Sequence, residues 1–90
     1  MKLKTMAWDD RIWTAFLRAA AFIPPAVRME AVVLVVEESE RLARRRSALL
    51  VEERDLMRAA VDKVPRAYRK VSLQTLVEQG LRLPDRAEPE

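Results

Sequence analysis

The 90-residue sequence lacks cysteine and histidine altogether and contains a single glycine. Without Cys, the chain can form neither disulfide bonds nor thiolate-ligated iron–sulfur clusters. Without His, the commonest zinc sites and histidine-based acid–base catalysis are excluded. One Gly leaves little room for tight turns with positive φ, which favours helices over hairpins. The composition therefore predicts a mainly α-helical protein that holds no cofactor and no metal.

An excess of charge of one sign is also missing. The 17 Lys and Arg residues nearly balance the 14 Asp and Glu residues, so the net charge is only +3. This is a weak indication of an anionic partner. The apolar runs fall short of the roughly 20 residues that a membrane span requires, and Asp9 and Asp10 break up the apolar core that a signal peptide needs. We expect a cytoplasmic chain with no membrane contact.

A chain of this length is short for a self-sufficient fold. Such domains bury only about 60 to 65 % of the surface that the unfolded chain exposes, so association would help to complete the core. We expect one helical domain over residues 1–80, made of a core at 8–60 and a helical extension at 61–80. Residues 81–90 carry two Pro and five charges and are expected to form a flexible tail. We expect no internal repeat.

The stretch from Ile23 to Ala43 is expected to form the central helix. Within it, the run Ala31–Val36 (AVVLVV) is apolar around the whole circumference of a helix rather than along one stripe. Either the chain's own helices cover this run, or another chain does. We favour the second possibility and predict a homodimer or a protein partner. The residues predicted to self-associate are Val32, Val33, Val35 and Val36.

Acidic residues and prolines mark the start and the end of the first helix. Asp9 and Asp10 are suited to begin a helix over about residues 10–22. Pro24 and Pro25 should end it, because proline disfavours α geometry in the residue before it. Proline also suits the first turn of a new helix, so the central helix should start here.

The central helix should continue to residue 45 or 46. Its polar side carries two pairs in the favourable acid-first i,i+4 order, Glu37 with Arg41 and Glu40 with Arg44. Three consecutive arginines at its C-terminal end oppose the negative end of the helix dipole. They are also candidates for contact with a phosphate group or a protein partner. These candidate binding residues are Arg44, Arg45 and Arg46.

The remainder of the chain predicts a short link and two more helices. Residues 47–51 (SALLV) favour an extended, strand-like segment. A third helix with acidic residues in its first turn should follow and end at Pro65. Ser72 is expected to cap a last helix over residues 73–79, and Gly80 to end it. Short helix, long central helix, strand-like link and helix is the order of elements in histone-like folds.

A set of residues between 8 and 60 forms a more specific pattern. It combines a Trp, a short helix, the segment IPPAVR at residues 23–28, a helix with Glu and Ala three apart, and an extended link into an acidic helix. The pattern resembles the small C-terminal domain found in light-independent protochlorophyllide reductase, which also occurs as free-standing small proteins. The matching residues are Trp8, Leu17, Ile23, Pro24, Val27, Arg28, Glu40, Ala43, Val51, Leu56 and Ala59.

This resemblance implies an accessory role. In the reductase the domain is an appendage that helps to cover the pigment site, whereas the cluster and the electron-transfer machinery belong to the rest of the complex. A chain without Cys ligands or a Gly-rich phosphate loop does not inherit the reaction. Adjacent acids such as Glu37 and Glu38 point to different faces of a helix and form no catalytic pair. We therefore expect a small, non-catalytic protein-interaction module that self-associates.

Arg28 is the candidate binding residue that the resemblance adds. Two roles are open for it. It can contact the partner or ligand, as the matching Arg of the resembled domain is placed to do. It can instead pair with an acid or a backbone carbonyl at the start of the central helix, because an Arg beside an apolar helix needs an acceptor.

Two alternative functions belong to other classes. The first is histone-like nucleic-acid binding, with phosphate contacts from residues 41–46 and 63–70, although acidic residues lie one turn from the first cluster. The second is binding of a tetrapyrrole or another apolar ligand in a groove. The residues expected to line that groove are Trp13, Phe16, Met29 and Met57.

Overall fold

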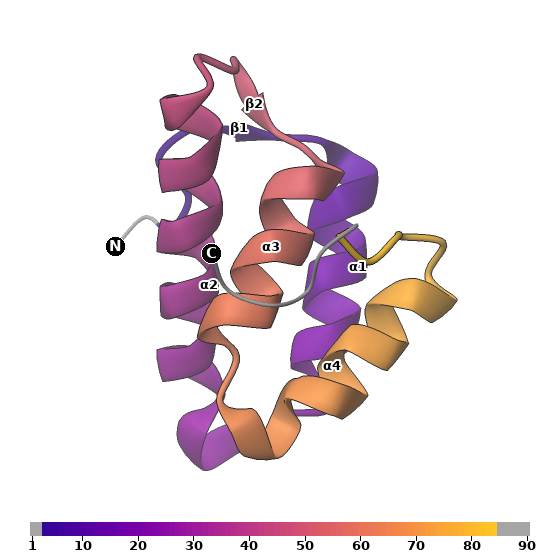
Figure 1. The fold of residues 1–90 in the computed structure, drawn as a ribbon. Helices are drawn as coiled ribbons and strands as arrows, with labels where there is room; N and C mark the ends of the chain where they lie inside the picture. The colour runs from indigo at the N-terminus through magenta and orange to yellow at the C-terminus, as the bar shows by residue number, and fades with distance from the viewer. Residues whose placement is uncertain (1–2, 85–90) are drawn as a thin grey trace.

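The fold is mainly α-helical, as the composition predicts, and a computed structural model describes residues 3–84 of it (Figure 1). Within that range the chain forms four helices and two short strands. In chain order they are β1 (Ala7–Trp8), α1 (Asp10–Ala20), α2 (Pro25–Arg45), β2 (Leu50–Val51), α3 (Glu53–Lys63) and α4 (Arg66–Glu78). No helix in this part of the chain is long and apolar enough to cross a membrane.

The first two helices begin where the sequence predicts. Asp9 is the N-cap of α1, and its carboxylate accepts the backbone N–H of Arg11 at 2.9 Å. Pro24 is the N-cap of α2, which begins at Pro25 and ends at Arg45. Proline fits both positions because the first backbone N–H groups of a helix have no partner within the helix.

The last helix starts earlier than predicted. α4 begins at Arg66, directly after Pro65, so Ser72 is not its cap. Ser72 instead lies inside α4, only 3 % exposed, and its hydroxyl has no hydrogen-bond partner among the described residues. Pro65 starts this helix in the same way that Pro24 starts α2. Gly80 does end it, with a φ of 97°, and the N–H of Leu81 closes the end on the carbonyl of Leu76.

The strands form a parallel pair at one end of the molecule. Ala7 pairs with Leu50 and Trp8 with Val51. The N–H of Asp9 continues the ladder by donating to the carbonyl of Val51 at 3.1 Å. The extended link at residues 47–51 was predicted, but β1 was not, since two residues before a helix carry no periodic signal.

The chain contains two units with a similar order of elements, although its sequence shows no internal repeat. Each unit consists of a two-residue strand, one acidic N-cap residue and an 11-residue helix, followed by a turn into a second helix whose N-cap is proline. The N-caps of the second helices, Pro24 and Pro65, have nearly the same backbone angles, with φ of −55° and −53°. The segments around them, IPPAVR and VPRAYR, share only Pro, Ala and Arg at fixed positions, which is too little for a repeat in the sequence.

The two units interlock. α2 of the first unit packs mainly on α3 of the second, and α4 of the second unit packs on α1 of the first. In Figure 1 the strand pair lies at the upper end of the molecule and both proline turns at the lower end. Each half therefore completes its hydrophobic core with helices of the other half.

The valine-rich run of α2 is buried within the chain itself. Val32, Val35 and Val36 are 6 %, 1 % and 0 % exposed. The prediction that these three form a self-association surface is therefore wrong, because other helices of the same chain cover them. Val33 is half-buried, and Leu34 is the residue of the run that remains well exposed, at 41 %.

The core continues past the helices into the segment predicted as a tail. Leu81 is 2 % exposed and belongs to the hydrophobic cluster. The N–H of Arg82 donates to Glu53 at the start of α3, at 2.7 Å. The flexible tail predicted for residues 81–90 is thus wrong at Leu81, and its part at 85–90 lies outside the described residues.

Candidate functional site

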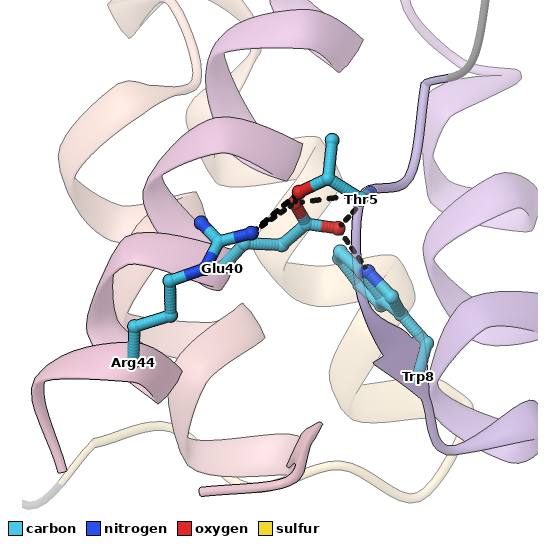
Figure 2. A network of polar contacts seen from close by, with 4 residues as sticks. All are labelled: Thr5, Trp8, Glu40 and Arg44. Atoms are coloured by element: carbon cyan, nitrogen blue, oxygen red, sulfur yellow. Dashed lines mark hydrogen bonds and ion pairs between the residues drawn. The ribbon is translucent and has the colours of Figure 1, made fainter. Parts of the chain in front are cut away.

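Glu40 is the centre of the most elaborate polar network (Figure 2). Its carboxylate accepts the backbone N–H and the hydroxyl of Thr5, and the indole N–H of Trp8 at 2.9 Å. Arg44, one turn further along α2, donates to the Thr5 hydroxyl and lies 3.8 Å from the carboxylate. Glu40 is 3 % exposed, so the predicted ion pair with Arg44 is part of a buried anchor rather than of a solvated helix face.

The network keeps Glu40 ionised. Burial raises the pKa of a carboxylate, but the hydrogen bonds from Thr5 and Trp8, together with the charge of Arg44, outweigh this effect and leave the pKa below its ordinary value. The N-terminal segment is thereby fastened to α2. The sequence does not reveal this role, because the Thr5 and Trp8 donors lie more than 30 residues away in the chain.

The three C-terminal arginines of α2 have different surroundings. Arg44 is occupied by Thr5 and Glu40. Arg46 binds Asp55 through both Nε (2.9 Å) and Nη2 (2.6 Å), and Glu52 at 2.9 Å. Arg45 forms no hydrogen bond or ion pair with any described residue, and its charge acts on Glu38 at longer range. The structure therefore does not bring these arginines together as one binding site.

Arg46 supports the start of α3. Asp55 is 2 % exposed and accepts the backbone N–H of Glu52, forming a capping box with the Glu52 side chain. Hydrogen bonds from Arg46 to this pair raise the pKa of the guanidinium above its ordinary value. The arginine therefore connects the end of α2 to the first turn of α3. The sequence does not predict this contact, because Arg46 and Asp55 lie nine residues apart in the chain.

Arg28 takes the second of its two predicted roles. Its Nε donates to the carbonyl of Ile23 at 3.0 Å, and its Nη2 to that of Ala21 at 3.2 Å. Arg69 does the same in the second unit, with Nε and Nη2 both on the carbonyl of Val64. Arg28 is thus a structural residue of a proline turn. Its donors bond backbone carbonyls of the same chain rather than a partner.

Most of the residues that carry the family resemblance build the fold. Seven of the eleven are 6 % exposed or less: Trp8, Ile23, Glu40, Ala43, Val51, Leu56 and Ala59. Their pattern therefore describes how the helices pack rather than a ligand site.

Three of the four arginines at residues 41–46, the first cluster expected to bind nucleic acid, are paired with acids. Arg41 donates to Glu38 at 2.8 and 2.6 Å, in place of the predicted pair with Glu37. The hydrogen bond from Arg41 lowers the pKa of Glu38, and burial opposes it. Arg44 and Arg46 are also engaged with acids, so few cations of this cluster remain for phosphates.

The side chains expected to line a groove for an apolar ligand do not share one surface. Phe16 and Met57 are core residues, 5 % and 1 % exposed, whereas Met29 is 65 % exposed. Trp13 packs edge-on against Trp8 with 4.9 Å between ring centroids. The cavity inside the core measures about 10 Å³, which is room for about one water molecule. Among the described residues, no group of three or more acids forms a site that could hold a metal ion.

An apolar groove runs along the outer face of α4, and we call it the α4 groove. Its volume is about 380 Å³. Val77 is 43 % exposed and Leu83 is 50 % exposed, so apolar surface is open to solvent here. The sequence did not predict the groove because the start of this helix was expected too late. The lining residues are Lys70, Leu73, Gln74, Val77, Glu78 and Leu83.

In comparisons of the chain with known proteins, no family model matches it, no curated protein matches it significantly and no solved structure does.

Proposed function

We propose that this chain is a small, non-catalytic accessory module that binds another protein chain through the α4 groove. The observation that carries the proposal is the exposed apolar lining of this groove, formed by Val77 and Leu83 beside the half-buried Leu73. Apolar surface rimmed by polar side chains is typical of protein-binding sites. The rim here consists of Lys70, Gln74 and Glu78.

The accessory role extends the resemblance to the C-terminal domain found in light-independent protochlorophyllide reductase. That domain also acts beside other chains rather than alone. The internal use of Arg28, Arg44 and Arg46 supports the α4 groove over the arginines as the docking surface, because their donors are already engaged within the fold.

Site-specific photo-crosslinking tests the proposal. A benzophenone amino acid replaces Val77 in the groove, and Val71 serves as the matched control, because it lies in the same helix, is 39 % exposed and is outside the groove lining. Irradiation takes place in cells that naturally contain the chain, and the adducts are identified by mass spectrometry. We expect one discrete protein adduct from position 77 that is missing from position 71. Identical adduct patterns from both positions would contradict the proposal.

A further inference from the structure

The similarity of the two units shows that the α4 groove corresponds to a covered face in the other unit. Counted from the capping residues Pro24 and Pro65, Leu73 matches Val32 and Val77 matches Val36. Val32 and Val36 are 6 % and 0 % exposed, whereas Val77 is 43 % exposed. The same helix face is therefore buried in the first unit and open in the second.

Charges at the two ends of the groove are of opposite sign. Lys70 and Glu78 lie two helical turns apart on the side of α4 that also carries Gln74. Neither Lys70 nor Glu78 forms a hydrogen bond or an ion pair with residues 3–84. A helix of the same sequence, placed antiparallel across Gln74, brings its Glu78 opposite Lys70 and its Lys70 opposite Glu78. The groove is thus complementary in charge to a second copy of itself.

We infer that the partner in the α4 groove is a second copy of this chain, related by a two-fold axis that passes near Gln74. The inference rests on the proposed function and names its partner. In such an isologous dimer, Leu73 and Val77 of each copy pack on Val77 and Leu73 of the other, and the Lys70–Glu78 pair forms twice. The self-association predicted from the valines of α2 would thus take place through α4 instead.

The dimer is weak and depends on ionic strength. One face of a 13-residue helix buries less than the roughly 800 Å² per partner of standard stable complexes. The two surface ion pairs are screened by salt, with a Debye length of about 8 Å at physiological ionic strength. The dissociation constant should therefore rise with salt.

Charge exchange tests this inference on the full chain. Sedimentation equilibrium at low salt measures the dissociation constant of wild type, Lys70→Glu, Glu78→Lys and the double variant K70E/E78K. We expect each single variant to dimerise about tenfold more weakly, because two like-charge contacts replace two ion pairs. The double variant restores opposite charges across the interface and should return to within about threefold of wild type.

A control variant separates the interface from net charge. Glu37→Lys makes the same charge change as Glu78→Lys at the matching position of α2 and should leave the dissociation constant unchanged. A monomeric wild type, or a double variant as weak as the singles, would overturn the inference. If the crosslinker at Val77 then captures a different protein, the proposed function stands while the second copy is ruled out as partner. Far-UV circular dichroism verifies that all variants keep their helices.

Discussion

At the scale of single residues, the buried Glu40 carboxylate connects the N-terminal segment to α2 through its hydrogen bonds. Its oxygens are satisfied by neutral donors of Thr5 and Trp8 as well as by the nearby charge of Arg44. A buried carboxylate is tolerated only with such partners. Its loss should therefore destabilise the fold more than the loss of an exposed acid on the same helix.

We predict that Glu40→Gln destabilises the fold by about 2 kcal/mol at neutral pH, because an amide offers one acceptor oxygen where the carboxylate offers two. The pKa of Glu40 is lowered by folding, so its contribution is present above its ordinary value of 4.5 and disappears as the pH falls through the folded value. The difference between variant and wild type should thus shrink in acid.

Urea denaturation between about pH 3 and 7 measures this difference. Glu37→Gln is the control, since Glu37 is exposed on the same helix. The lowered pKa of Glu38 makes the wild type and the Glu40→Gln variant both lose some stability in acid, but it does not affect their difference. If the difference in free energy of unfolding between wild type and Glu40→Gln stayed constant across this pH range, the charge of Glu40 would not be what stabilises the fold.

At the scale of elements, each unit is shaped by a proline turn that an arginine closes. Proline supplies the helix N-cap but no side chain that can bond the free backbone groups. The arginine four residues after the proline bonds the carbonyls that precede it, in both turns. The turn thus combines a stiff φ angle with a charged donor.

We predict that Arg28→Ala and Arg69→Ala each lower the free energy of unfolding by about 1 kcal/mol, because each turn loses a part-buried hydrogen bond from a charged donor to a backbone carbonyl. Arg66→Ala is the matched control, since Arg66 is exposed at the start of α4 and has no hydrogen-bond partner among residues 3–84. Chemical denaturation measures the free energy of unfolding of all three variants and of the wild type. Equal stability of all three would refute a structural role for the two closing arginines.

At the scale of the whole molecule, the interlocking of the two units makes each depend on the other. α1 packs on α4 and α2 on α3, so neither half keeps its core when the other opens. The strand pair also joins one strand from each unit. Unfolding should accordingly be a single cooperative transition.

The positions of the tryptophans allow a direct measurement of this cooperativity. Trp8 and Trp13 both belong to the first unit, whereas far-UV circular dichroism reports helices of both units. We predict that denaturation curves from Trp fluorescence and circular dichroism coincide. A dichroism phase that precedes the fluorescence change would mean that the second unit unfolds on its own and that the units are not interlocked.

The sequence by itself determined the helical class, the starts of α1 and α2 and the end of α4, because capping acids, prolines and the single Gly act on neighbouring residues. Only the tertiary structure decided which faces are covered. The valines of α2 are buried by other helices of the same chain, which the apolar pattern of α2 alone does not show. Glu40, Arg28 and Arg46 have their roles through partners brought together by folding, and the open α4 groove exists because its counterpart in α2 is filled. The residues of a short segment determine its backbone preference, whereas burial depends on contacts between residues far apart in the chain.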